Sequence, residues 1–428
     1  MQRLFIYTLL ILSAVSNTVS AQEKSILLLN GFLHKGNGEV IASAHIGIRN
    51  GKITELKNSL ASTYKKEEWD TIVDLMGKHV YPSFIAPNST LGLTEIDAVR
   101  ASRDFAEVGV YNPHVRAQIA YNVESKVIST VRTNGVLIAQ ASPRSGDITG
   151  SSSIMFLDGW NWEDATLLKD DGIHVNWPSS LQGGGWWAEP APKTRNEKYD
   201  EQKKALFDFF TLAKAYADAS KKAEKDIRLE AMADCFNGTK RVYFRANDIQ
   251  ELLDVIDFAK HFGLKYPVIV GGYDSHLIGK RLKDSGIPIM LGRTHALPQH
   301  EDDPIDLPFR LPAILKELGI KFCLQNEGDM EAMNARNLPF QAGTAMAYGL
   351  SEEEAIRAIT LDAAEIMGFS KEYGSIEIGK SATLFVSEGN ALDMRSNNVT
   401  LALIRGKLMP LTNFQQELYQ RYSEKYKN

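Results

Sequence analysis

The sequence predicts an α/β protein in which a (β/α)8 TIM-type barrel is joined to a small composite β-sandwich. The chain has 428 residues; such a barrel takes about 250 of them, which leaves room for one smaller domain. The second half repeats the order strand, amphipathic helix, glycine stop, which is typical of βα units in a parallel sheet. Short strand-like segments flank this region at both ends of the chain.

The N-terminal segment has the pattern of a small antiparallel β unit. Strands are expected at residues 25–29, 45–48 and 53–56. Asn50 and Gly51 lie between the last two, and Asn-Gly favours the positive φ angles of a type I′ hairpin turn. After Gly368 the chain returns to short strands, at 381–386 and 400–404, which are expected to complete the same unit.

The region after Val80 is expected to alternate strands and helices. Strands are expected at 242–244, 268–270, 287–291 and 321–324. Helices are expected at 249–262, 274–285 and 311–318, ending at Gly263, Gly286 and Gly319, with one or two longer helices within 196–233. Residues 144–153, rich in Gly and Ser, favour a flexible loop. In such a barrel the loops after the strands form the active face.

The first residues indicate an export signal. Arg3 precedes an apolar run at 4–15, and the small residues Val19-Ser20-Ala21 follow. The expected organisation is a signal peptide at 1–21, an N-terminal sandwich segment at 22–79, the barrel at 80–368, and a C-terminal sandwich segment with a tail at 369–428. Periplasmic or extracellular localisation follows, with no membrane span after cleavage.

Composition points to no particular partner, and the charge balance gives no support to nucleic-acid binding, for which a basic stripe would be expected. A net charge of −5 and 44% hydrophobic residues describe an ordinary globular protein without a basic stripe. Only Cys235 and Cys323 are present; export permits a disulfide, but two lone cysteines favour small buried apolar residues.

Three motifs, taken together, resemble the amidohydrolase superfamily and its imidazolonepropionase-like members. They are Val-Tyr-Pro-Ser-Phe-Ile at 80–85, the helix at 349–368 that begins Gly-Leu-Ser, and Gly-Ser-Ile-Glu-Ile-Gly-Lys-Ser-Ala at 374–382. The resemblance implies hydrolysis of C–N bonds in amides or cyclic amides. It also implies one or two divalent metals in the barrel mouth, held by histidines and carboxylates.

The positions where this resemblance places metal ligands carry other residues. Asn88 and Thr90 stand in place of a His-x-His pair, Arg245 and Gly271 in place of histidines after the fifth and sixth strands, and Glu327 ends the stretch where an Asp follows the eighth. A fixed guanidinium repels a metal ion. We therefore expect no metal and no other cofactor at these positions.

The loop after the seventh strand carries the remaining polar candidates. His295 and His300 are the expected ligands of zinc or another divalent metal if a relocated site exists, or a general base; the alternative is a solvated loop. Arg293 with Arg245, and also Arg336, would suit an anionic ligand. The alternative is that these arginines pair with acidic neighbours such as Glu327.

Two functions are therefore open. The first is an amidohydrolase acting on C–N bonds through a changed or metal-free site, and the second is a non-catalytic binding or partner protein. A small-molecule ligand, a homo-oligomer or a complex with an intact paralogue would fit; nucleic acid would not. Gly-Gly-Gly-Trp-Trp at 183–187 is read as a lid over the pocket, or as a loop whose aromatics pack on the barrel.

Overall fold

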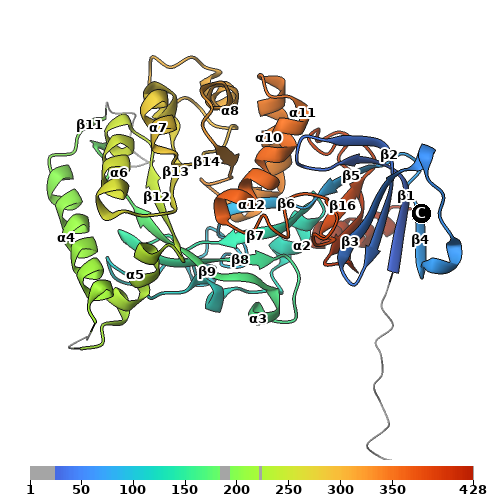
Figure 1. The fold of residues 1–428 in the computed structure, drawn as a ribbon, viewed down its shortest axis with the longest axis horizontal. Coiled ribbons are helices and arrows are strands. Elements are labelled where there is room, and N and C mark those ends of the chain that lie inside the picture. The colour runs from blue at the N-terminus through green and yellow to red at the C-terminus, as the bar shows by residue number, and fades with distance from the viewer. Residues whose placement is uncertain (1–24, 184–192, 221–223, 428) are drawn as a thin grey trace, which may run out of the picture.

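The structure is a computed structural model that describes residues 25–183, 193–220 and 224–427 (Figure 1). The expected signal peptide and the two tryptophans of the expected lid lie outside these described residues.

Strands from both ends of the chain form one sheet. Its members are β1 (Ser25–His34), β2 (Val40–Arg49), β3 (Lys52–Asn58), β4 (Thr71–Asp74), β5 (His79–Pro82), β16 (Leu384–Ser387), β17 (Val399–Ile404) and β18 (Lys407–Leu408). The order is β18-β17-β16-β5-β1-β2-β3, and β4 also pairs with β1. Asn50 and Gly51 have φ angles of 52° and 73°, as the predicted hairpin turn requires.

This sheet has a hydrophobic core of its own to which both ends of the chain contribute. Leu28 and Ile46 from the N-terminal strands pack in one cluster with Leu384 and Leu403 from the C-terminal strands. The antiparallel pairing of β16 with β5 sets Leu384 opposite Pro82. The C-terminal strands thus continue the sheet of the N-terminal strands, although about 300 residues separate the two groups in the chain.

The second sheet forms a nearly closed barrel, which confirms the predicted fold class. Its strands are β6 (Phe84–Ser89), β7 (Val136–Ala141), β8 (Ile148–Phe156), β9 (Thr166–Asn176), β12 (Arg241–Ala246), β13 (Pro267–Gly271), β14 (Ile289–Leu291) and β15 (Phe322–Leu324). They neighbour one another in chain order from β6 to β15. β12 to β15 are parallel to one another and to β9, so the expected fifth to eighth strands are where the sequence placed them.

The expectation of strict strand–helix alternation fails at β8, which runs antiparallel to both β7 and β9. Much of this strand lies in the segment expected to be a flexible loop. All nine residues of β8 are buried. The Ser152 hydroxyl donates a hydrogen bond to Asp171 Oδ1 at 2.8 Å, and the Ser153 hydroxyl accepts one from the Asp170 amide at 2.9 Å. Small polar residues can form a buried barrel strand when their polar groups are hydrogen-bonded. A segment rich in Ser and Gly nevertheless has the composition of a loop, which is why the sequence did not predict this strand.

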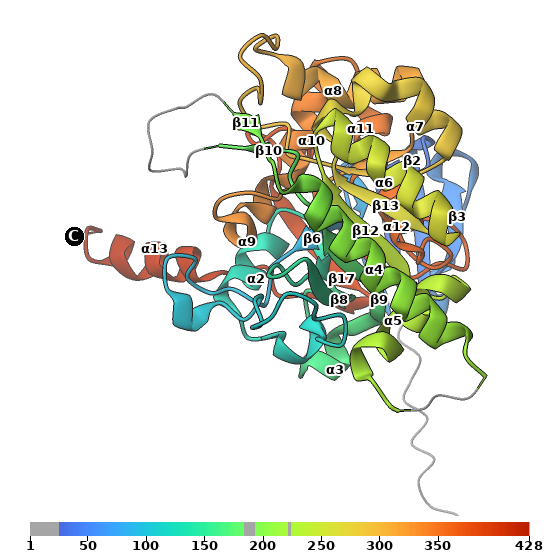
Figure 2. The ribbon, with the colours of Figure 1, turned by 90° about the vertical axis from the view of Figure 1, so that its left-hand side faces the viewer.

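Helices cover the outside of the barrel, as Figures 1 and 2 show for α4, α6 and α7. The α-helices are α2 (Lys126–Arg132), α3 (Trp162–Ala165), α4 (Tyr199–Asp218), α5 (Ile227–Asn237), α6 (Ile249–Phe262), α7 (Gly279–Ser285), α8 (Leu307–Leu318), α9 (Glu331–Asn334), α10 (Leu338–Ala347), α11 (Glu352–Ala358), α12 (Leu361–Met367) and α13 (Phe414–Glu424). Short 3-10 turns are η1 (Ser59–Ala61), η2 (Lys66–Glu68), η3 (Arg100–Ser102), η4 (Ala117–Ala120), η5 (Tyr273–Ile278) and η6 (Ala335–Asn337), and β10 (Leu181–Gln182) pairs with β11 (Thr194–Arg195).

Local sequence signals place several helix ends. Asp248 and Glu251 form a capping box at the start of α6, and Gly263 ends that helix in the left-handed conformation. The expected helix at 274–285 instead begins as η5 and becomes α-helical only at Gly279. In η5 the Asp274 amide bonds to the carbonyl of Asn247 at 2.9 Å, a contact outside the helix that sequence periodicity does not reveal.

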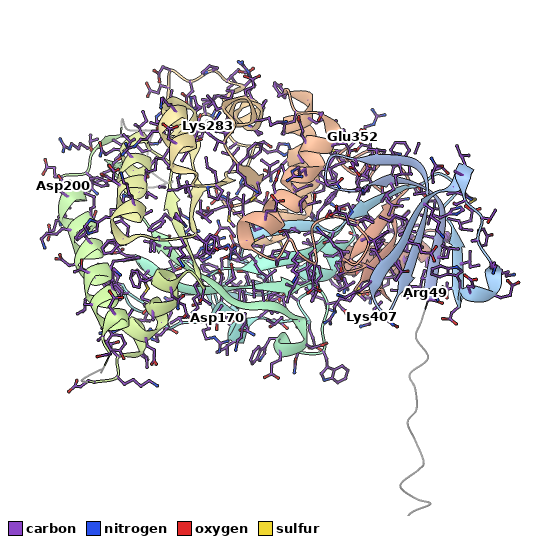
Figure 3. The ribbon with its side chains drawn as sticks, in the orientation of Figure 1. Arg49, Asp170, Asp200, Lys283, Glu352 and Lys407 are labelled. Carbon is purple, nitrogen blue, oxygen red and sulfur yellow. The ribbon has the colours of Figure 1, made fainter. Side chains whose placement is uncertain are left out.

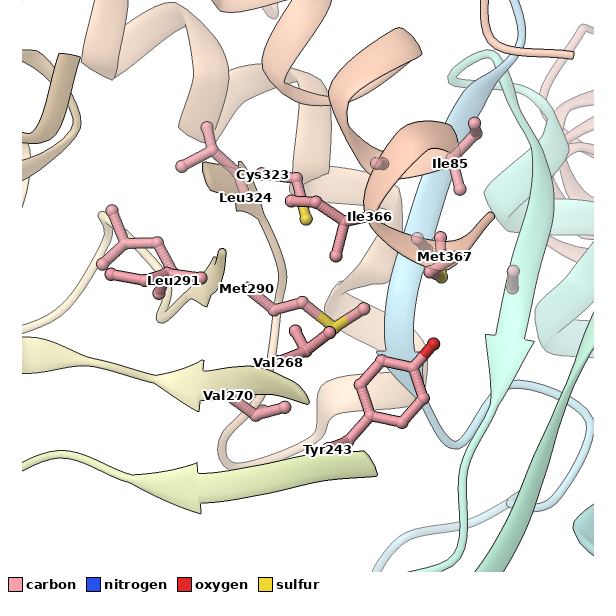
Figure 4. Packing of buried hydrophobic residues seen from close by; sticks show 14 of the residues in the cluster. Ile85, Tyr243, Val268, Val270, Met290, Leu291, Cys323, Leu324, Ile366 and Met367 are labelled. Carbon is pink, nitrogen blue, oxygen red and sulfur yellow. The ribbon is translucent and has the colours of Figure 1, made fainter. Parts of the chain in front are cut away.

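Buried apolar side chains of neighbouring barrel strands pack together in one core. Val268, Met290 and Cys323 belong to this core and are at most 1% exposed (Figure 4). Cys235 and Cys323 are both buried free thiols, as the favoured interpretation has it. Burial raises the pKa of the Cys235 thiol to about 12, so it is not a reactive nucleophile at neutral pH.

Charged side chains of both signs are spread over the β-rich sheet and the barrel. Arg49 and Lys407 lie on the β-rich sheet, and Asp200 and Lys283 lie on barrel helices (Figure 3). In the stretches of chain that the structure describes, none of the helices combines the length and the apolar character needed to cross a membrane.

Candidate ligand site at the barrel mouth

An ion pair joins the ends of the fifth and eighth barrel strands. Arg245 on β12 places its Nε 2.6 Å from Oε1 of Glu327, which follows β15. Arg144, in the loop after β7, approaches the same carboxylate oxygen at 3.8 Å. Two guanidinium groups therefore share one carboxylate at the mouth.

Asn88 connects this pair to the first strand. Its amide nitrogen donates to Oε2 of Glu327 at 3.0 Å, and its Oδ1 accepts hydrogen bonds from Arg144 and, at 3.2 Å, from Arg245. The residue is fully buried, with a φ of 49°. The only side-chain oxygen of Asn88 thus already faces two positive charges.

Thr90 lies beside this network and belongs to a second carboxylate. Its backbone amide and its hydroxyl both donate to Oε2 of Glu331, at 2.6 and 2.7 Å. Arg144 reaches that oxygen as well, at 3.7 Å. Two arginines and two glutamates consequently balance one another in charge.

Electrostatics keep the Glu327–Arg245 pair ionised. Burial by itself would raise the pKa of Glu327, but Arg245 and Arg144 outweigh it and hold the pKa below its ordinary value. Burial lowers the pKa of Arg245, an effect that Glu327 opposes and Arg144 adds to.

Gly271, at the end of the sixth strand, has no room for a side chain. Its φ is +102°, and an added Cβ would lie 2.4 Å from Oδ1 of Asn247. Both the backbone conformation and the close approach exclude a side chain larger than hydrogen unless Asn247 moves.

A pocket of about 460 Å³ opens beside this network, at the ends of β12 to β15. Its lining combines charged and apolar side chains with backbone: Arg245, Asn247, Gly271, Tyr273, Leu291, Gly292, Arg293, His295, Ala296, Gln299, Pro308, Leu311, Gln325, Glu327, Gly328 and Asp329. Asn88 and Thr90 are not part of this lining. Asn88 contacts it through Glu327, whereas Thr90 is hydrogen-bonded to Glu331, which also lies outside it. Arg336, which the sequence suggested for the mouth, is an exposed residue of η6 outside the lining.

The two histidines of the seventh loop have separate partners. His295 lines the 460 Å³ pocket, and its Nε2 lies 2.7 Å from the Thr344 hydroxyl. His300 lines a smaller neighbouring pocket of about 210 Å³, with Nε2 2.9 Å from Oδ1 of the buried Asp274. Burial, followed by the charge of Arg293, lowers the pKa of His295.

Comparison with known proteins shows what this chain and its architecture are similar to. The sequence profile of the amidohydrolase family matches residues 211–409. A crystal structure of an amidohydrolase from Thermotoga maritima MSB8 matches with a TM-score of 0.77 at 24% identity, over 90% of this chain and 99% of that chain. The chain therefore resembles the amidohydrolase family in sequence over its second half, and it shares the fold of a solved amidohydrolase.

Other solved structures share the fold at lower similarity. A prolidase complexed with N-methylphosphonate-L-proline matches with a TM-score of 0.53 at 15% identity, over 90% of this chain and 99% of its own. An adenosine deaminase from Xanthomonas campestris with bound zinc also gives 0.53, at 12% identity, over 94% and 97%. At such identities the likeness concerns the fold alone. A search of curated proteins gave no match.

The residues in this barrel mouth do not fit the divalent metals that the amidohydrolase resemblance implies. Zinc and related ions take imidazole and carboxylate donors, whereas Arg245 supplies a cation and Gly271 no side chain. Glu327 is already in ion pairs with two guanidinium groups. Within residues 25–183, 193–220 and 224–427, no group of three His, Cys, Asp or Glu side chains is arranged to hold a metal ion.

Sequence reasoning missed a polar layer deeper in the barrel. Asp171 on β9 accepts hydrogen bonds from Tyr243 at 2.6 Å and from Gln140 at 2.8 Å. His174 stacks on Tyr243 with ring centroids 4.5 Å apart, and its buried Nε2 has no hydrogen-bond partner among the described residues. Arg144 was missed as well, because nothing in the sequence shows that the loop after β7 brings its guanidinium to Glu327. The one available signal was polar residues recurring within otherwise apolar strands.

Proposed function

We propose that this amidohydrolase-like protein binds a small molecule in its barrel mouth and has no metal-dependent hydrolytic activity. The observation that carries the proposal is the ion pair of Arg245 with Glu327, at 2.6 Å. Metal-dependent hydrolysis needs an ion that brings the pKa of a bound water towards neutrality. Here a guanidinium, which has no open coordination position and no water to activate, neutralises the carboxylate.

The proposal is supported by the surroundings of this pair. Asn88 and Thr90 are hydrogen-bonded to glutamates, and Gly271 has no side chain, so none of the three offers a free anionic or imidazole donor. The 460 Å³ pocket beside them is of the size that holds small-molecule ligands. Binding of a small molecule would use this pocket and would not require the metal-binding side chains that the chain lacks.

One observation favours a second candidate, the metal-free hydrolysis of an amide C–N bond. His300 faces the small pocket with its Nε2 2.9 Å from the buried carboxylate of Asp274. A buried carboxylate that orients an imidazole is the arrangement of a general base. Amide hydrolysis through this pair would require His300 but no metal.

Hydrolysis assays separate these functions. The protein is purified without chelators and incubated with amides, cyclic amides and dipeptides, with zinc, with manganese and without metal. The proposal expects no turnover in any arm. Turnover that needs metal would refute it, and metal-free turnover lost in His300→Gln would establish the second candidate. His276→Gln, a change at another histidine of the same face, controls for nonspecific effects.

A further inference from the structure

We propose that the ligand of the 460 Å³ pocket is a small zwitterion, an α-amino acid with an apolar side chain. This inference rests on the proposed function, because it takes the pocket as a binding site rather than a metal centre. It is carried by two opposite charges on the pocket wall that the described residues of the protein leave without an ionic partner.

Arg293 is the unpartnered positive charge. It follows β14, and its Nε and Nη2 donate to the backbone carbonyls of Glu327 and Asp329, at 2.6 and 3.2 Å. Among the described residues no carboxylate lies within 4.0 Å of its guanidinium; the ion pairs of the mouth are made by Arg144 and Arg245. Both of its bonds therefore orient the group without neutralising it.

Gly328 makes this position of Arg293 attainable. The glycine has a φ of +134°, and an added Cβ would lie 1.7 Å from Nη2 of Arg293. The guanidinium lies against the bare backbone of the loop after the eighth strand, held there by two hydrogen bonds. Such a fixed fork binds a carboxylate with little loss of side-chain entropy.

Asp329 is the unpartnered negative charge. It is exposed on the lining of the same pocket, and its carboxylate makes no ion pair within the described stretches of the chain. Since Arg245 and Glu327 compensate each other, the described lining carries one free cation and one free anion. A simple anion would satisfy Arg293 but would be repelled by Asp329; a ligand with both charges satisfies both.

The rest of the pocket accommodates an apolar group. Leu291, Pro308 and Leu311 are buried or nearly so and contribute to the lining. His295 adds no charge at neutral pH, because burial and the neighbouring Arg293 lower its pKa. An α-amino acid such as leucine combines a carboxylate, an ammonium group and an aliphatic side chain within a pocket of this size.

Titration calorimetry with three compounds tests the inference on the full-length protein. Leucine has both charges, isocaproate lacks the ammonium group, and isoamylamine lacks the carboxylate. Because a hydrogen bond to a charged group contributes about tenfold or more in affinity, leucine should bind at least about tenfold more tightly than either analogue. Equal binding of isocaproate and leucine would overturn the role of Asp329, and absence of leucine binding would overturn the whole inference.

Two variants test which side chain binds each charged group of the ligand. Arg293→Gln should reduce leucine affinity to that of isoamylamine, and Asp329→Asn should reduce it to that of isocaproate. Arg336→Gln, an exposed arginine outside the lining, should leave affinity unchanged. Thermal unfolding checks that each variant folds. The comparison of the three compounds on the wild-type protein tests the inference even if a variant does not fold. Unchanged leucine affinity in folded Arg293→Gln protein would overturn the inference.

The two proposals fail differently. Metal-dependent turnover of the amides refutes the proposed function, whether or not leucine is discriminated from its analogues. Absence of both turnover and leucine binding leaves the proposed function in place and overturns the zwitterion.

Discussion

Arg245 occupies a position at which the superfamily resemblance implies a metal-binding histidine, and its guanidinium supplies positive charge to the mouth. It is 21% exposed and Glu327 is 27% exposed, so both charges are largely withdrawn from water. Removing two charges from water costs more free energy than their mutual attraction returns, unless further hydrogen bonds satisfy both groups. Asn88 and Asn176, which accept hydrogen bonds from Arg245, supply that additional pairing.

We predict that Arg245→Ala lowers the free energy of unfolding by about 3 kcal/mol. The more distant Arg144, at 3.8 Å, is then the one arginine among the described residues that pairs with Glu327. Urea denaturation measures the change. Arg245→Met combined with Glu327→Leu should recover most of the loss, since the buried ion pair is then removed as a unit. Arg310→Ala, which removes an exposed pair with Asp306 at 4.0 Å, should change stability by less than about 1 kcal/mol. A loss in Arg245→Ala no larger than that of Arg310→Ala would contradict the prediction.

His174 gives the fold a dependence on pH. Burial lowers its pKa well below the ordinary 6.5, and the charges of Arg245 and Arg144 act in the same direction. Below pH 6.5, His174 therefore binds a proton in the unfolded chain but stays neutral in the folded protein. The contribution of His174 to stability is complete above pH 6.5 and is lost as the pH falls below it.

The corresponding prediction is a decline in unfolding free energy as the pH falls from 6.5 to about 5, and this decline should be smaller in His174→Gln. Urea titrations at several pH values measure it. His261→Gln, a change at an exposed histidine of α6, is the matched control and should keep the wild-type slope. The same slope in His174→Gln as in wild type would show that His174 does not carry the effect.

At the scale of elements, the sequence predicted best where local signals decide the structure. The bounds of α6 were expected as observed, because a capping box and a left-handed glycine mark its two ends. The strand β8 was not expected, because its Ser and Gly residues are stabilised by partners such as Asp171 that lie on another strand. Side-chain pairing between strands leaves no periodic signal in a single sequence.

The same division holds for the candidate site. The ends of the fifth, sixth and eighth strands could be located, so Arg245, Gly271 and Glu327 were expected at the mouth, where they lie. The partners of these residues could not be predicted. Arg144 reaches Glu327 from a loop about 180 residues away in the chain, and only the barrel brings the two together.

The loop after β15 provides a prediction at this scale. Gly328→Ala should displace Arg293, because the added Cβ falls 1.7 Å from its Nη2. We expect a loss of about 1–3 kcal/mol in stability and at least about tenfold in leucine affinity. Gly379→Ala is the matched control, with a φ of +89° and open space around the added Cβ. Equal losses of stability and of leucine affinity in the two variants would show that backbone strain alone causes them, and that Arg293 is not displaced.

At the scale of the whole molecule, one sheet contains strands from both ends of the described chain. The first described residue, Ser25, already belongs to β1 and pairs with Arg49. The expected cleavage after Ala21 would leave a short segment ahead of this strand. We predict that the exported protein begins near Gln22; intact-mass measurement of exported material tests this, and a mass that includes residue Leu4 would contradict it.

The central claim concerns the whole barrel mouth: an ion pair takes the position of the metal. The most direct measurement is elemental analysis of protein purified without chelators and equilibrated with zinc, manganese and iron. We predict metal far below one equivalent in the wild-type protein. One equivalent of any of these metals, lost on His295→Ala, would contradict the claim, because the seventh loop would then provide the relocated metal site in the mouth and the hydrolase function would be restored.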